Sequence, residues 1–218
     1  EEKKRISEQL DKYMPQLTRQ CMHVPLADTP AVHIEGFPYL LNFLKALDHI
    51  EDEAYWNKSG IPYCFSNFDV PMLHVTGWYD SCKSATLENY RLARTQGGSP
   101  WMRSAQKLII GPWVHGLGSG RSIGSIDFGA LASPEGAGLD QDMLHWFDYF
   151  LKQKGNEKDM QPRVQYFMMG SNQWRFGNEW PLPESKQVAF YLSSVHAANS
   201  RQGDGRLSRQ QPTECASM

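Results

Sequence analysis

The sequence has little of what marks several large classes of protein. It contains only four cysteines in 218 residues, and their scattered positions form neither a CxxC pair nor the spacing of a zinc site. No apolar run approaches the roughly 18 residues that a membrane-spanning helix needs. The 22 lysines and arginines nearly balance the 24 acidic residues, so no charge excess favours nucleic acid or an anionic membrane. We therefore expect free thiols, no metal, no cofactor, and neither a nucleic-acid nor a membrane partner.

Apolar residues, in contrast, are numerous enough to build a core. Hydrophobic residues make up 40% of the chain and aromatic residues 12%, which excludes a wholly disordered protein. Their helical spacing predicts a mostly helical unit in the first 66 residues, with helices over 1–22 and 37–57. The elements predicted next are a strand at 71–76, a helix at 83–95, a strand at 107–110 and a helix at 138–153. Such alternation is typical of a parallel α/β sheet.

The pattern changes after Gly155. Residues 164–169 and 188–192 are strand-like, turn-rich segments separate them, and no helical pattern follows. We expect these strands to open an all-β domain. Two or three strands cannot bury a sandwich core of their own, so the sequence predicts a β domain that is cut short.

Two ionisable residues follow the two predicted buried strands. Gly77-Trp78-Tyr79-Asp80 comes after the first strand, and Gly111-Pro112-Trp113-Val114-His115 comes after the second. Because the carboxyl ends of parallel strands form the edge where sites occur, we expect Asp80 and His115 to meet there. The order acid before base is that of the α/β-hydrolase triad. We predict that Asp80 orients the imidazole of His115, which takes the proton from a serine nucleophile.

One serine motif competes with this interpretation. Gly120-Arg121-Ser122-Ile123-Gly124 matches the pattern Gly-x-Ser-x-Gly. A nucleophile elbow needs a buried strand before it and a helix after it, and in this fold it precedes the base. Ser122 follows a glycine-rich segment and comes after His115, so we interpret the segment as a mobile loop beside the site.

Other candidate residues keep two interpretations each. Asp142, His145 and Asp148 have helical spacing that could hold a metal, and a solvated helix face is the alternative. His74 lies within a predicted strand, and we expect a satisfied interior or edge residue. Trp78, Tyr79 and Trp113 could line a substrate pocket or anchor the core. Trp174 and Trp180 are expected to pack between the β-rich part and the α/β part.

The two strand-end motifs resemble those of the cocaine esterase and X-Pro dipeptidyl-peptidase (CocE/NonD) family of α/β-hydrolases. Pro71-Met72-Leu73-His74-Val75-Thr76-Gly77-Trp78-Tyr79-Asp80 is similar to the acid motif of that family, and Gly111-Pro112-Trp113-Val114-His115 is similar to its base motif. Weaker similarity extends along most of residues 24–208. Cys82 departs from the pattern, because the family usually has a bulky aromatic residue there. The Gly-x-Ser-Tyr-x-Gly elbow of the family precedes the cap and is not in this sequence.

The resemblance implies a fold, a reaction and partners. It implies a partial helical cap over 1–66, the second half of an α/β-hydrolase sheet over 67–155, and the start of a β-jelly-roll over 156–218. The implied activity is hydrolysis of a small-molecule ester, amide or short peptide (an Xaa-Pro bond included) through an acyl-enzyme. Asp80 and His115 would be catalytic, and Trp78, Tyr79, Cys82 and Trp113 would bind substrate.

Two expectations concern what the chain does by itself. Because the nucleophile is missing, the chain alone is expected to be inactive, and a non-catalytic fragment or binding module is the alternative. An isolated half-sheet would expose an edge strand and an apolar face. We therefore expect a missing N-terminal portion, or a homo-oligomeric partner, to complete it.

Overall fold

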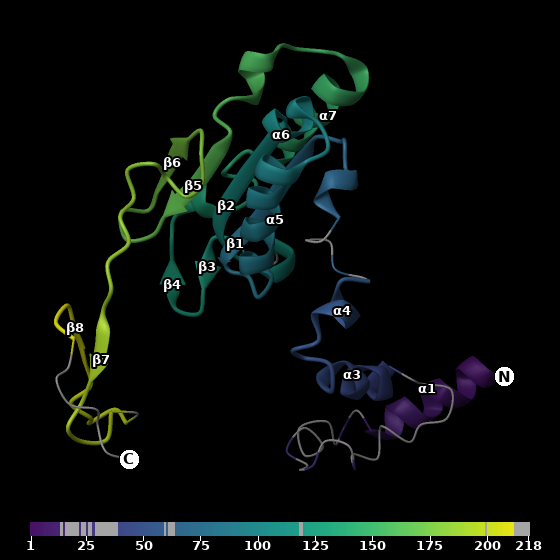
Figure 1. The fold of residues 1–218 in the computed structure, drawn as a ribbon, viewed down its shortest axis with the longest axis vertical. Helices are drawn as coiled ribbons and strands as arrows, with labels where there is room; N and C mark the ends of the chain where they lie inside the picture. Colours follow the sequence, from purple (N-terminus) through teal and green to yellow (C-terminus); the bar gives the residue numbers. More distant parts are fainter. Residues whose placement is uncertain are drawn as a thin grey trace. The chain divides into compact units, whose positions relative to one another are not determined.

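The chain forms two compact units, Glu1–Phe65 and Ser66–Met218 (Figure 1). A computed structural model describes residues 1–13, 15, 22, 25, 28, 39–58, 60, 64–117, 120–198 and 200–211. In the first unit the described helices are α1 (Glu2–Tyr13), α3 (Tyr39–Leu47) and α4 (Glu53–Trp56). None of the described helices is both long enough and apolar enough to cross a bilayer.

The helices predicted in the first unit are confirmed in part. The helix predicted over 1–22 forms from Glu2 to Tyr13, and most of the remainder lies outside the described residues. The one predicted over 37–57 is divided by a turn into α3 and α4. Asp52 causes the second helix to begin anew, because its carboxylate accepts a hydrogen bond of 3.0 Å from the backbone N–H of Tyr55. An aspartate in this position stabilises a helix start.

The second unit is built around a four-stranded sheet. Its elements in chain order, counting the 3-10 turn at the boundary, are η5 (Phe65–Asn67), β1 (Met72–Tyr79), α5 (Lys83–Gln96), α6 (Pro100–Ser104), β2 (Gln106–Val114), η6 (His115–Leu117), β3 (Ser122–Ile123), β4 (Ile126–Asp127), η7 (Ala130–Ala132), α7 (Leu139–Lys152), η8 (Glu157–Met160), β5 (Val164–Met168), β6 (Gln173–Gly177), β7 (Tyr191–Ser193) and β8 (Arg206–Ser208). The central sheet has the order β1-β2-β5-β6. Strands β1, β2 and β5 are parallel, and β6 runs antiparallel to β5.

The two buried strands of the sequence analysis both run further than predicted. The first was expected to end before Gly77 and the second to stop at Gly111-Pro112, but β1 reaches Tyr79 and β2 reaches Val114. The reason is a bulge: Gly77 pairs with Gly111, and the next pair is Tyr79 with Val114, so β2 holds one extra residue. A proline is tolerated within a sheet at such a bulge because no ladder hydrogen bond is needed there.

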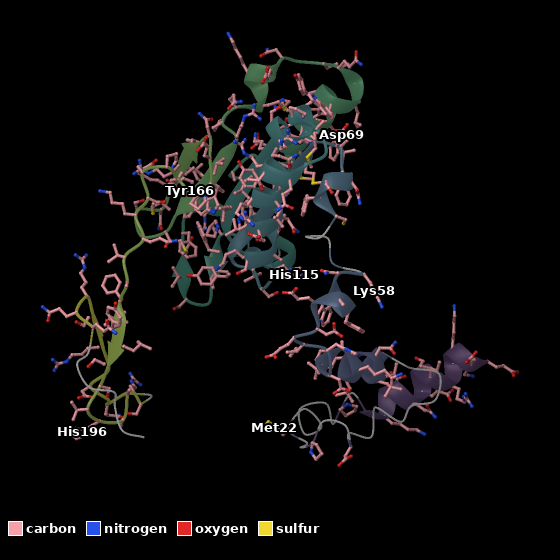
Figure 2. The ribbon with its side chains drawn as sticks, in the orientation of Figure 1. Met22, Lys58, Asp69, His115, Tyr166 and His196 are labelled. Carbon is pink, nitrogen blue, oxygen red and sulfur yellow. The ribbon has the colours of Figure 1, made fainter. Side chains whose placement is uncertain are left out.

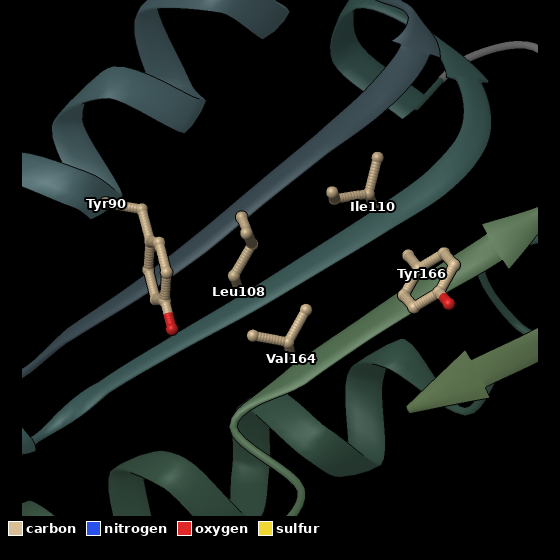
Figure 3. Packing of buried hydrophobic residues seen from close by; sticks show 5 residues of the cluster. All are labelled: Tyr90, Leu108, Ile110, Val164 and Tyr166. Carbon is tan, nitrogen blue, oxygen red and sulfur yellow. The ribbon is translucent and has the colours of Figure 1, made fainter. Parts of the chain in front are cut away.

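Helices cover both faces of the sheet, and successive side chains of β2 point to one face and then the other. Tyr90 of α5 packs on Leu108 and Ile110 of β2, and Figure 3 shows these side chains beside Val164 and Tyr166 of β5. Ile109 points to the other face, where it packs with Leu139 of α7. Burying one such aliphatic side chain contributes roughly 1.5–3 kcal/mol. A helix–sheet–helix arrangement therefore holds β1 and β2 in place.

The β-rich C-terminal part differs in two respects from the prediction. The strand predicted at 164–169 forms as β5, but it extends the central sheet as a neighbour of β2. The strand predicted at 188–192 begins only at Tyr191, and it pairs with β8 in a separate antiparallel sheet. The second unit is thus a mixed α/β fold with a parallel core and a small antiparallel C-terminal sheet. Its division at residue 155 stays a prediction.

Candidate functional site

The bulge in β2 brings Asp80 and His115 together. Tyr79 and Val114 are paired, and Asp80 and His115 are the next residue on each strand. The Nδ1 of His115 lies 3.0 Å from Oδ1 of Asp80, which is a hydrogen bond. Figure 2 labels His115 at the end of the sheet that lies away from α6. Without the extra residue Asp80 would face Val114, so the bulge sets the pairing of acid and base.

Local backbone bonds fix the position of the Asp80 carboxylate. The backbone N–H of Asp80 donates to the carbonyl of Gly77 at 3.0 Å, and Lys83 N–H donates to the Asp80 carbonyl at 3.2 Å. The Oδ1 atom accepts a second hydrogen bond, of 2.7 Å, from the backbone N–H of Cys82. These bonds place the carboxylate directly before the first turn of α5.

The surroundings of Asp80 keep it ionised. The hydrogen bond from the Cys82 backbone holds the pKa of this carboxyl below its ordinary value, and the bond to His115 acts in the same direction. Partial burial opposes these two effects. The Thr76 hydroxyl, which has no hydrogen-bond partner among the described residues, lowers the pKa of Asp80 least. A carboxylate that is ionised at neutral pH can accept a hydrogen bond from the imidazole throughout the physiological pH range.

His115 is open to solvent on the side away from Asp80. Its side chain is 71% exposed, whereas that of Asp80 is 11% exposed. An ionised carboxylate can only accept, so Nδ1 of His115 carries the hydrogen and Nε2 of the neutral ring is the acceptor. The next two residues, Gly116 and Leu117, have positive φ angles of 73° and 62°, which turn the chain sharply after the base. The free edge of the imidazole is therefore available to a substrate hydroxyl or a nucleophile.

Tyr79 and Cys82 are both exposed and lie within two residues of Asp80 in the chain. The Tyr79 side chain is 42% exposed, and its ring centroid lies 6.3 Å from that of Phe128. Cys82 is exposed, is not in a disulfide, and stands at the N-cap of α5 without a side-chain capping bond. Its sulfur lies 3.9 Å from the hydroxyl of Ser81. Of the four predicted pocket residues, Cys82 thus lies beside the acid and Tyr79 directly precedes it in the chain.

Of the two tryptophans proposed for the pocket, Trp113 is in the core and Trp78 packs against it. Trp113 is fully buried, and its indole N–H donates to the carbonyl of Ala132 at 2.7 Å. Trp78 is half-buried, donates to the carbonyl of Phe167 at 2.6 Å, and packs against Trp180 with ring centroids 6.0 Å apart. Of the two interpretations offered by the sequence, these contacts fit core anchors.

Trp174 and Trp180 were expected to pack between the β-rich part and the α/β part, and both contact rings of the central sheet. The ring centroid of Trp174 lies 5.9 Å from that of Trp113 and 5.4 Å from that of Phe167. The ring centroid of Trp180 lies 5.6 Å from that of Tyr166. The four indoles therefore stabilise the strands that carry the site, and none of these contacts involves the acid or the base.

The competing candidates are accounted for by ordinary structure. Ser122 is in a short hairpin, where β3 pairs with β4, and no helix follows it as a nucleophile elbow requires. The hairpin replaces the mobile loop that the sequence suggested. His74 is a satisfied interior residue, because its Nε2 lies 2.9 Å from Oε1 of the buried Gln106.

The acidic residues of α7 have partners of their own. Asp142 bonds the buried amine of Lys107 at 3.0 Å, and Asp148 bonds Lys152 at 2.5 Å. Both carboxylates are thereby engaged in ion pairs, which favours a structural role for this helix face over the metal site considered above.

One set of side chains has the composition of a metal site. The ligand atoms of Asp80, Cys82 and His115 all lie within 4.8 Å of one another. All three residues were predicted at the site from the sequence, but not as ligands of one ion. The signal was present as an Asp-x-Cys pair after one predicted strand and a histidine after the next.

Comparison with known proteins gives the same context. Residues 13–117 match the X-Pro dipeptidyl-peptidase (S15 family), and residues 156–216 match the X-Pro dipeptidyl-peptidase C-terminal non-catalytic domain. The cocaine esterase of Rhodococcus sp. (strain MB1 Bresler) is 27% identical over 184 residues, which is 84% of this chain and 30% of that protein.

A solved structure shows a similar fold. The aminopeptidase from a marine sediment archaeon (Thaumarchaeota archaeon) superposes with a TM-score of 0.58 at 24% identity, over 81% of this chain and 27% of that chain. The chain therefore spans about 30% of the length of these relatives. The two motifs, the acid–base geometry and the two family matches agree: the chain belongs to the CocE/NonD family of α/β-hydrolases.

Proposed function

We propose that this chain supplies the acid and the base of a serine hydrolase that cleaves ester or amide bonds through an acyl-enzyme. The observation that carries the proposal is the 3.0 Å contact between Asp80 and His115 at the carboxyl ends of adjacent parallel strands. Asp80 holds the Nδ1–H tautomer and stabilises the imidazolium, and Nε2 of His115 takes the proton of a serine hydroxyl. The serine itself is proposed to come from outside residues 1–218.

The substrate of the proposed enzyme is a small ester, an amide or a short peptide, with the Xaa-Pro bond in this class. Members of the family include an esterase and X-Pro dipeptidyl-peptidases, which supports the range of bonds. Tyr79 and Cys82 are the side chains beside the acid that would touch the acyl or leaving group. We further propose that residues 1–66 are part of a helical cap and that residues 156–218 begin a β-jelly-roll.

The test of the acid and base uses the complete enzyme. Asp80→Asn presents the wrong group to Nδ1, and loss of the correct tautomer costs about 10⁴ in kcat in the known protease case. The kcat of His115→Ala is expected to fall by at least the same factor. His145→Ala, an exposed histidine on α7, is the matched control and should retain wild-type turnover. Near-normal turnover of His115→Ala would remove the basis of the proposal.

A second test addresses the nucleophile. After incubation of residues 1–218 with a fluorophosphonate probe, we expect intact-mass analysis to show no adduct, because Ser122 lies in a hairpin. A stoichiometric adduct on Ser122 that disappears in His115→Ala would show that this chain carries its own nucleophile.

The edge of the sheet bears on how the complete site would be assembled. Among the described residues β1 has a neighbour on one side only, which is β2. An open strand edge with exposed apolar groups nearby promotes association. We propose that further sheet, from the same protein or a second copy, pairs with β1. A monodisperse monomer of residues 1–218 with a cooperative thermal transition would argue against this.

A further inference from the structure

The acid–base pair is part of a larger group of potential metal ligands. Asp80 and Cys82 are two residues apart at the start of α5, and His115 reaches them from the end of β2. Their ligand atoms lie within 4.8 Å of one another, and no other three-residue group of this kind occurs in the part of the chain that the structure describes. The group combines a carboxylate, a thiol and an imidazole, the three side-chain types that bind zinc.

The spacing is close to what one tetrahedral ion needs. Zinc binds nitrogen and oxygen at about 2.0–2.2 Å and sulfur at about 2.3 Å, so ligand atoms around one ion lie roughly 3.3–3.7 Å apart. The Nδ1 of His115 and Oδ1 of Asp80 are already 3.0 Å apart. The exposed thiol of Cys82 makes no capping bond and has one long contact, of 3.9 Å, to the Ser81 hydroxyl. Its sulfur lies within 4.8 Å of both other ligand atoms.

The local charge also suits a divalent ion with a thiolate ligand. The first turn of a helix stabilises negative charge, and α5, with 14 residues, begins immediately after Cys82. The nearest cation in sequence, Lys83, is turned to Trp78: its amine donates to the Trp78 carbonyl at 3.2 Å. One carboxylate, one thiolate and one neutral imidazole would balance the two charges of the ion.

We propose that Asp80, Cys82 and His115 bind Zn²⁺ as an open three-ligand site, and that the ion switches off the hydrolase. On binding, the thiol loses its proton to solvent and sulfur bonds the ion. The ion takes the place of the Nδ1 proton between His115 and Asp80. That proton moves to Nε2, so the ring can no longer accept a proton from the serine. The inhibition rests on the proposed function, whereas the binding does not.

Metal binding is tested on residues 1–218 with zinc and cobalt alone. We expect a stoichiometric zinc isotherm by calorimetry and, with Co²⁺, a thiolate-to-metal charge-transfer absorption. Loss of a group that merely supports a metal site costs about 10–100-fold in affinity, so Cys82→Ser, which removes a ligand, should cost at least tenfold and abolish the absorption. Cys64→Ser is the matched control and should keep both. Equal affinity of Cys82→Ser and wild type, or no absorption, would overturn the proposal.

Inhibition is tested on the complete enzyme. Micromolar zinc should inhibit the wild type, a chelator should restore its activity, and the inhibitory concentration should rise at least tenfold in Cys82→Ser relative to the uninhibited rate of that variant. Equal inhibition of both proteins would overturn the regulatory role. The two proposals fail separately: full activity of His115→Ala would refute the hydrolase assignment and leave the zinc isotherm untouched. An absent isotherm would refute only the metal site.

Discussion

Gly77 of β1 lies directly against the backbone of Trp113 in β2. A Cβ added to Gly77 would stand 2.0 Å from the carbonyl oxygen of Trp113 and 2.5 Å from its carbonyl carbon. Both atoms belong to the main chain of a buried strand, so neither can turn aside as a side chain could. We therefore predict that Gly77→Ala forces the two strands apart at the bulge.

The size of the effect follows from this geometry. Overpacking against a side chain lowers the free energy of unfolding by about 1–3 kcal/mol. Because the backbone cannot move aside as a side chain does, we expect Gly77→Ala to lie at the upper end, at about 3 kcal/mol. For a unit of this size that lowers Tm by about 6–12 °C. To bring the contact to an acceptable separation, the strands must move by about 1 Å, which would break the 3.0 Å bond from His115 to Asp80. A displacement of about 1 Å at a catalytic group costs about 100-fold in rate.

The assay compares Gly77→Ala with a glycine that has room. A Cβ on Gly205 would meet its nearest neighbour, the Ala198 carbonyl oxygen, at 3.4 Å, an ordinary contact. Gly205→Ala should therefore shift Tm by no more than about 2 °C. Thermal unfolding followed by circular dichroism gives Tm, and kcat of the complete enzyme reports on the site. If the two variants unfold at the same temperature, the argument from strand separation is refuted.

Three further changes test individual residues. Burial lowers the pKa of His74; the unfolded chain then binds the proton more readily, so the free energy of unfolding should be constant above pH about 6.5 and fall below it. Hydrogen bonds lower the pKa of Asp204 to about 2, and the largest contribution comes from the Ser194 hydroxyl. The β7–β8 hairpin should therefore keep full protection from hydrogen exchange above pH about 4 and lose it as the pH falls from about 4 to about 2. Tyr90→Phe removes a buried hydroxyl without a partner among the described residues, so chemical denaturation should show a stability unchanged or raised by about 1 kcal/mol.

Each change has its own control. His74→Gln should flatten the pH dependence between about 5 and 6.5, and an unchanged slope would show that another group is responsible. Asp204→Asn should remove the acid transition of the hairpin while the central sheet keeps its protection. A loss of more than about 1 kcal/mol in Tyr90→Phe would indicate that the hydroxyl has a partner after all.

The position of the acid and base could be predicted from the sequence because it depends on local pattern. Each residue follows a short apolar run, and the ends of adjacent parallel strands necessarily meet at one edge. The bulge that pairs Asp80 with His115 could not be predicted in this way. Gly111-Pro112 is a strong stop signal by composition, and only the register with β1 shows that the strand continues through it as a bulge.

Long-range packing limits the rest of the prediction. The apolar run that forms β5 has the same local character whether it opens a new domain or joins β2, and its register with Leu108–Ile110 depends on residues more than fifty positions away. The same limit applies to Trp113, whose buried indole depends on the carbonyl of Ala132. Likewise, Cys82 becomes a potential ligand only because β2 brings His115 beside it.

The crossover that joins β1 to β2 also bears on the order of folding. The pairing runs from Met72 with Gln106 to Tyr79 with Val114, so the acid and base meet through contacts confined to one continuous segment. The β1–β2 pairs are 34 or 35 positions apart in the chain and the β2–β5 pairs are 56 apart, so the first pairing closes the shorter loop and is expected to form earlier. In pulse-labelled hydrogen exchange we therefore expect β1 and β2 to be protected before β5. The acid–base geometry would then be a product of early folding, in place before the sheet has reached its full width.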